Sequence, residues 1–162
     1  MPDLALFDFD GTLTHGETFP RFVRSLVPAE RLRAGQLRLA PLVVGYRLGL
    51  VSGTRVRAAI VDRALAGMDE AGFEAAARAW AGNELPGMLR PQALARLRAH
   101  RDRGDAVWVV SGNFQALVAP WAASEGVAAL GSRLEARDGV LTGRYAGAQC
   151  GLEEKAARIR AE

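Results

Sequence analysis

The chain has 162 residues, 49 % of them hydrophobic and 24 % charged, which excludes disordered, collagen-like and low-complexity proteins. Its single cysteine, Cys150, excludes an intrachain disulfide and favours a reducing compartment, for which we predict the cytoplasm. The net charge is +3 and the isoelectric point about 9.7, but the basic residues are scattered, which argues against a nucleic-acid-binding surface.

The first predicted element is a strand over Leu4–Phe9. Apart from Asp8 it is apolar throughout, as in a central strand of an α/β sheet. The strand begins almost at the first residue, and we see no secretory signal before it.

Residues 17–85 predict only helices and loops. An apolar helix face begins at Phe19, and Thr54 and Asp69 are each expected to cap a later helix. The longest apolar stretch, Leu39–Val51, is shorter than the ~20 residues that a membrane span needs. We expect a core helix there; the alternative is an apolar surface that meets a membrane or an apolar substrate.

Strand and helix then alternate to the end of the chain. Ala106–Val110 predicts a second buried strand, and Asp138-Gly139 lies at the centre of a hairpin signal. The other predicted elements are helices from Pro91, from Asn113 to Glu125 and from Leu152, and a short strand near Ala129. The pattern predicts an α/β core, residues 1–16 and 86–162, interrupted after its first strand by a helical insertion, residues 17–85.

Two carboxylates stand where the first strand ends. Asp8 and Asp10 are two positions apart, so strand geometry points both side chains to the same side. Close carboxylates repel, and a divalent cation relieves this; Mg²⁺ suits such oxygen ligands. The Gly11 backbone and the Thr12 hydroxyl that follow are suited to hold an anion.

A second polar group follows the second strand. Ser111, Gly112 and Asn113 are predicted to open a helix, where a hydroxyl and free N–H groups make an anion site. Lys155, the only lysine among 21 basic residues, would add a compact positive charge. A nucleophilic carboxylate, a second carboxylate, a metal and a phosphate cradle together indicate phosphoryl transfer through an aspartyl-phosphate.

Four segments resemble the haloacid dehalogenase (HAD) superfamily, in its phosphoserine phosphatase-like subfamily IB. "DFDGTLT" resembles motif I and "VVSGNF" motif II, "GSRLEARDGVLTG" resembles a hairpin segment of that branch, and "CGLEEK" resembles motif III. The matches run in order from residue 4 to 158. The resemblance implies a Rossmann-like parallel-sheet core with a helical C1-type cap inserted after the first strand.

The resemblance also implies roles for single residues. Asp8 would be the nucleophile and a Mg²⁺ ligand, while Asp10 would be the general acid/base and would bind the metal through its backbone carbonyl. Ser111 and the Gly112 N–H would hold phosphate, and Lys155 would balance charge. The cap would exclude water. Glu17 matches the position that meets the substrate amine; otherwise it is a helix-entry acid.

Two departures from the family leave alternatives open. The apolar segment Leu39–Val51 resembles the caps of subfamily members that act on lipid phosphates. In the phosphoserine phosphatases a cap arginine binds the serine carboxylate, and no arginine of this chain is a confident match for it. Arg55, Arg57 and Arg63 are merely nearby. Motif IV, which supplies further metal-binding acids, is absent, so the core looks C-terminally incomplete and a piece of a longer protein is the favoured explanation.

We therefore predict a Mg²⁺-dependent phosphomonoesterase that acts on a small phosphorylated metabolite. A lipid-phosphate phosphatase is the first alternative, with membrane contact possible but not favoured. The second alternative is a non-catalytic binding domain, or an inactive fragment that lacks motif IV.

Overall fold

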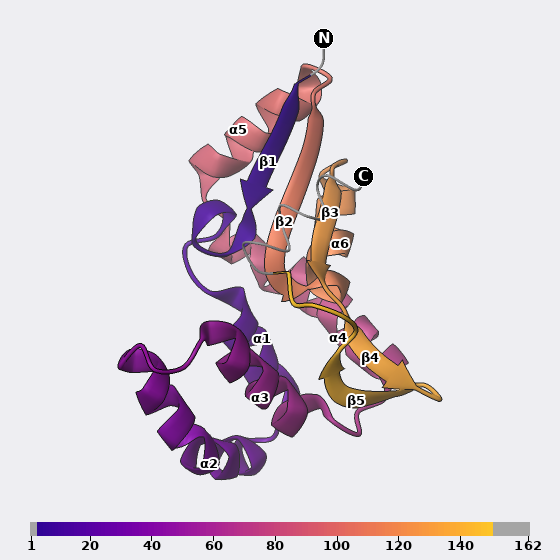
Figure 1. The fold of residues 1–162 in the computed structure, drawn as a ribbon. Helices are drawn as coiled ribbons and strands as arrows, with labels where there is room; N and C mark the ends of the chain where they lie inside the picture. Colours follow the sequence, from indigo (N-terminus) through magenta and orange to yellow (C-terminus); the bar gives the residue numbers. More distant parts are fainter. Residues whose placement is uncertain (1–2, 151–162) are drawn as a thin grey trace.

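The computed structural model describes residues 3–150. Within these residues the central sheet has three parallel strands in the order β1-β2-β3, so β1 forms an edge of the described sheet (Figure 1). The strands are β1 (Leu4–Asp8), β2 (Ala106–Phe114) and β3 (Ala128–Ser132). The α/β class and the parallel sheet predicted from the sequence are confirmed.

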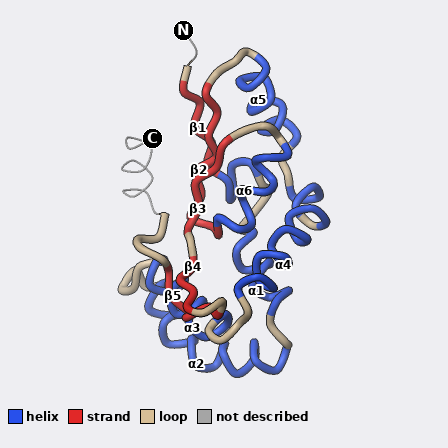
Figure 2. The backbone as a smooth tube through the Cα atoms, turned by 90° about the vertical axis from the view of Figure 1, so that its right-hand side faces the viewer, coloured by secondary structure: helices blue, strands red, loops and turns tan. Residues whose placement is uncertain are grey.

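Helices cover one face of this sheet. Helices α5 (Pro91–Asp102) and α6 (Gln115–Ser124) lie on the same side of the strands in Figure 2. Ala5 of β1 is buried beneath them, whereas Leu4 and Leu6 are exposed among the described residues. In the described part of the chain β1 is therefore an edge strand whose burial alternates, and not the central strand that its apolar sequence indicates.

Between Thr18 and Asn83 the chain forms four helices. They are α1 (Thr18–Leu26), α2 (Ala29–Arg47), α3 (Gly53–Leu65) and α4 (Glu70–Asn83), followed by a short 3₁₀ turn over Leu85–Met88. Asp69 caps α4 as predicted, by accepting from the Gly72 N–H at 2.7 Å. The cap of α3 is Ser52 and not Thr54, because the Ser52 hydroxyl accepts from the Arg55 N–H at 3.3 Å.

The apolar segment Leu39–Val51 differs most from its prediction. Its first part belongs to α2, where Leu39 and Val43 are half-buried. Leu48 and Leu50, however, are among the most exposed apolar side chains that the structure describes. The expectation of a core helix is thus wrong for the second half of the segment.

The predicted hairpin forms between β4 (Leu134–Arg137) and β5 (Val140–Tyr145), with Asp138 and Gly139 both at positive φ in its turn. Its second strand packs against α3, and Leu141 exchanges backbone hydrogen bonds with the segment before α4 (Figure 1). The hairpin therefore supports the helical insertion, although it follows β3 in the sequence.

Aromatic rings join the insertion to the sheet. Phe114, at the end of β2, contacts Phe19 and Phe22 of α1, Phe73 of α4 and Tyr145 of β5, with ring centroids 5.3–6.4 Å apart. Phe114 is buried, and such pairs add about 0.5–1.5 kcal/mol each beyond their area. This cluster fixes the helices beside the strand ends where the polar residues lie.

Candidate active site

Asp8 ends β1, and the chain then makes a tight turn over Phe9–Leu13. Gly11 has φ +78°, a conformation that other residues rarely adopt. The Thr14 N–H closes the turn on the Phe9 carbonyl at 3.1 Å. The turn leaves Asp8 exposed and Asp10 partly buried, both at the carboxyl edge of the sheet.

The carboxylate of Asp10 is held by two buried neighbours. Its Oδ1 accepts from the backbone N–H of Thr18 at 2.9 Å and from the Thr18 hydroxyl. The side-chain amide of Asn113 donates to Thr18 Oγ1 at 2.6 Å and reaches Asp10 Oδ2 at 3.4 Å. Since Thr18 begins α1 and Asn113 lies on β2, the network ties the carboxylate to both the insertion and the sheet.

Ser111, Gly112 and Asn113 lie within the end of β2. They do not open a helix as predicted, because the strand continues to Phe114 and α6 begins at Gln115. Ser111 is buried, and its hydroxyl accepts from the Asn113 N–H at 3.0 Å. Any anion site here therefore depends on the strand end and its side chains rather than on the dipole of α6.

One cavity of about 460 Å³ collects most of the candidate residues. Asp8, Asp10, Glu17, Ser111 and Gly112 line it together with residues that the sequence did not assign to the site. These are Tyr46, Gly53, Thr54, Arg57, Gln149 and Cys150. Two separate strand ends and the insertion thus face one space.

The other predicted residues lie elsewhere. Gly11 and Thr12 are not part of this lining, and the Gly11 N–H donates within the turn, to Thr14 Oγ1 at 3.3 Å. Asn113 lies behind the lining, where it holds Asp10 through Thr18. Lys155 lies outside the described residues.

Arg57 connects the insertion to the strand end. Its Nη1 donates to the Gly112 carbonyl and its Nη2 to Glu17 Oε2, both at 3.1 Å. The guanidinium carbon also lies 5.0 Å from the centroid of the Phe19 ring. Sequence reasoning placed Arg57 only among three nearby arginines, because its contacts come from segments 40 and 55 residues away.

The donor chemistry at the strand ends is compatible with Mg²⁺. The Asp8 carboxylate and the Asp10 backbone lie in the same turn, and both residues line the cavity. Residues 3–150 hold no group of three or more acidic, histidine or cysteine side chains placed to bind a metal.

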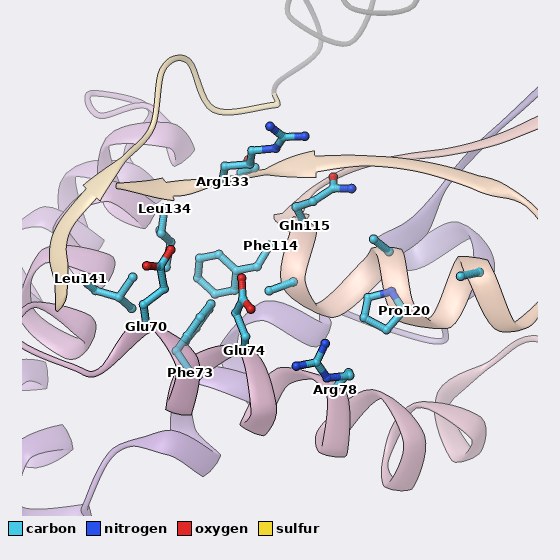
Figure 3. Close-up of a pocket in the computed structure, with 14 residues that line it drawn as sticks. Glu70, Phe73, Glu74, Arg78, Phe114, Gln115, Pro120, Arg133, Leu134 and Leu141 are labelled. Carbon is cyan, nitrogen blue, oxygen red and sulfur yellow. The ribbon is translucent and has the colours of Figure 1, made fainter. Parts of the chain in front are cut away.

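A second cavity, of about 530 Å³, lies between α4, α6 and β4 (Figure 3). Phe73, Phe114 and Leu134 give it an apolar lining, and Glu70 and Glu74 point into it from α4. Neither Asp8 nor Asp10 lines it, and neither does Ser111. The smaller cavity is therefore the better candidate for an active site.

Comparisons with known proteins show what the chain is similar to. The family model described as haloacid dehalogenase-like hydrolase matches residues 5–162. Protein CicA of Caulobacter vibrioides (strain NA1000 / CB15N) is 37 % identical over 161 residues, which cover 98 % of this chain and 72 % of that protein.

Solved structures share the fold. A protein with unknown function from Bordetella pertussis Tohama I superposes with a TM-score of 0.80 at 24 % identity, over 99 % of this chain and 74 % of that one. A substrate-bound phosphoserine phosphatase complex superposes with a TM-score of 0.64 at 23 % identity, over 99 % and 73 %. At such identities the likeness establishes the fold alone.

Proposed function

The chain belongs to the haloacid dehalogenase-like hydrolases, and from this premise we propose that it is a Mg²⁺-dependent phosphomonoesterase working through an aspartyl-phosphate. The observation that carries the proposal is the meeting of Asp8, Asp10 and Ser111 in one cavity of about 460 Å³. This volume suits a small phosphorylated metabolite. A cytoplasmic location is part of the proposal.

In the first step a carboxylate oxygen of Asp8 attacks phosphorus, and the bond from phosphorus to the ester oxygen breaks. Asp10 protonates the departing oxygen. In the second step Asp10 takes a proton from water, and the resulting oxygen attacks phosphorus and frees Asp8 and phosphate. Ser111 and the Gly112 N–H are proposed to hold the phosphoryl oxygens, with Lys155 balancing their charge.

The Asp8 carboxylate and the Asp10 backbone carbonyl are the groups proposed to hold Mg²⁺. When bound, the ion would offset the negative charge that Asp8 and a phosphate bring together. Asp10 keeps its carboxylate for proton transfer, and its bonds to Thr18 support this division of roles.

Residues 17–85 are proposed to act as the cap, and residues 1–16 and 86–162 as the core. Arg57 supports this role because it links α3 to Glu17 and to the Gly112 carbonyl, across the mouth of the cavity. Glu17 stands at the N-cap position of α1, and its carboxylate pairs with Arg57 in the cavity lining, which supports a role toward the cavity. A carboxylate and a guanidinium at this position suit a substrate with both an amine and a carboxylate, such as phosphoserine.

A lipid phosphate is the second candidate substrate. The exposed Leu48 and Leu50 support it, because they lie between Tyr46 and Gly53, which both line the cavity. Phosphoserine and phosphatidylglycerophosphate are therefore tested side by side.

The test is phosphate release from both substrates, with Mg²⁺ and with EDTA. We expect Mg²⁺-dependent release that Asp8→Asn abolishes. The matched control is Asp3→Asn, a change of the same kind at the other end of β1 and outside the cavity, which should keep the activity. Release that survives in Asp8→Asn, or that is indifferent to the metal, would refute the proposal.

A further inference from the structure

Helix α2 is apolar on two opposite faces. Its inner face, with Leu39 and Val43, lines an apolar groove shared with α1 and α3. Its outer side carries exposed apolar residues: Leu37 is 80 % exposed, and Val44, which also borders the groove, is 53 % exposed. After the helix ends at Arg47, Leu48 is 68 % and Leu50 79 % exposed. A helix that is apolar on both faces needs cover on both, and the described residues supply it on one face only.

The same region carries an unusually high positive charge. Residues 18–65 contain nine arginines and two acids, a net charge of +7, whereas the whole chain carries +3. Arg33, Arg38, Arg47 and Arg55 are exposed, and none of these four forms an ion pair with another residue that the structure describes. Exposed leucines and exposed guanidinium groups in one region match the chemistry of an anionic lipid surface, which is apolar inside and negatively charged outside.

Other occupants fit this surface less well. A second copy would bring +7 against +7, and a nucleic acid would match the arginines but leave the leucine side chains in water. Among the described helices none is long and apolar enough to cross a membrane. If α2 lies in the plane of the bilayer surface with its leucines inserted, the exposed leucines, the excess of arginines and the lack of a spanning helix among those described are all accounted for.

We propose that the outer face of α2 and the loop after it, Leu37, Val44, Leu48 and Leu50, dock on an anionic bilayer, with Arg47 and Arg55 contacting lipid headgroups. The loop is fixed to the cavity wall, because Gly45 packs on Val51 and Gly53 on the Tyr46 ring. Docking would therefore bring the cavity mouth close to the headgroups. This inference does not depend on the proposed hydrolysis, since surface binding needs no turnover.

Co-sedimentation with vesicles tests the inference directly. We expect the chain to sediment with vesicles of phosphatidylcholine mixed with phosphatidylglycerol, not with phosphatidylcholine alone, and to be released by high salt. The double variant Leu48→Asp/Leu50→Asp should bind at least about tenfold more weakly, since both apolar side chains that enter the bilayer are lost. Arg47→Gln should weaken binding about fivefold.

The matched control is Val140→Asp, which places a carboxylate at an exposed apolar position of β5 outside this surface. It should bind as the parent does, and far-ultraviolet circular dichroism verifies that each variant is folded. Failure of the parent to bind, equal binding to both vesicle types, or unchanged binding of the Leu48/Leu50 variant would overturn the proposal. So would release of the vesicle-bound chain by a single-stranded oligonucleotide without any effect of the leucine changes.

Discussion

Arg57 Nη2 lies 3.1 Å from Glu17 Oε2, and this ion pair joins α3 to the start of α1 at the edge of the candidate active site. The other arm of the same guanidinium, Nη1, donates to the carbonyl of Gly112 at the end of β2. A single side chain thus links the insertion, the sheet and the cavity lining. Its position suggests a role in holding both the cap and the substrate.

Replacing Arg57 by alanine should impair substrate binding more than stability. A partly exposed ion pair contributes at most about 1 kcal/mol to folding, whereas loss of a charged substrate contact costs roughly tenfold or more in KM. Steady-state kinetics on phosphoserine and a denaturant titration separate the two effects. Arg55→Ala, two residues away in the same helix and outside the cavity, is the matched control. A change in kcat alone would argue against substrate contact.

Thr18 should affect both turnover and stability, because its backbone N–H and its hydroxyl both donate to the Asp10 carboxylate. Thr18→Val keeps the shape but removes the hydroxyl, which leaves the buried Asn113 amide without one of its partners. We expect kcat to fall by about 10- to 100-fold, because the carboxylate is no longer fixed in position. Unfolding in urea should show a loss of about 1–3 kcal/mol. Thr18→Ser should restore both values; if it behaves like valine, the hydroxyl is not the relevant group.

Two substitutions in the aromatic cluster should have opposite consequences. Phe114→Ala removes a buried ring that contacts four others, and we expect a loss of about 3–5 kcal/mol in the free energy of unfolding. Tyr145→Phe should be neutral or stabilise by up to about 1 kcal/mol, because its buried hydroxyl has no hydrogen-bond partner in the described part of the chain.

Burial raises the pKa of Tyr145 to about 12, in agreement with an apolar setting for this phenol. Chemical denaturation of both variants measures the differences. Marked destabilisation by Tyr145→Phe would mean that its hydroxyl is paired in solution.

The Glu125 carboxylate should make the free energy of unfolding depend on pH in the acidic range. Its carboxylate accepts two hydrogen bonds of 2.8 Å from Arg98, and these bonds lower the pKa of Glu125 below 4.5. The stabilisation that the Glu125–Arg98 pair gives the folded state is therefore present above pH 4.5, and it is lost as the pH falls through the lowered pKa of Glu125. Glu125→Gln should cost about 1 kcal/mol at pH 7 and little at strongly acidic pH, as thermal unfolding across this range would measure. A cost independent of pH would point to packing.

Local patterns predicted those parts of the molecule that depend on local chemistry. The family, the parallel sheet, the Asp69 cap and the Asp138-Gly139 turn all follow from short segments, and each is confirmed. The site residues remain predictions, although Asp8, Asp10, Glu17, Ser111 and Gly112 do line one cavity.

Features that depend on contacts between distant segments could not be predicted from the sequence. The bonds of Arg57 span 40 and 55 residues, and Thr18 meets Asn113 over 95, so no spacing rule connects them. The leucines of α2 and of the loop after it were expected in the core because hydrophobicity does not say which face of a helix finds a partner.

The most direct test of the proposal is chemical trapping of the phosphorylated carboxylate. The protein is incubated with Mg²⁺ and phosphoserine or phosphatidylglycerophosphate, quenched in acid, and reduced with borohydride, which converts an aspartyl-phosphate into homoserine. Peptide mass spectrometry then locates the modified position. The account predicts homoserine at position 8, only with both substrate and metal present. Phosphate release without homoserine at position 8, or with homoserine at position 10 instead, would contradict it.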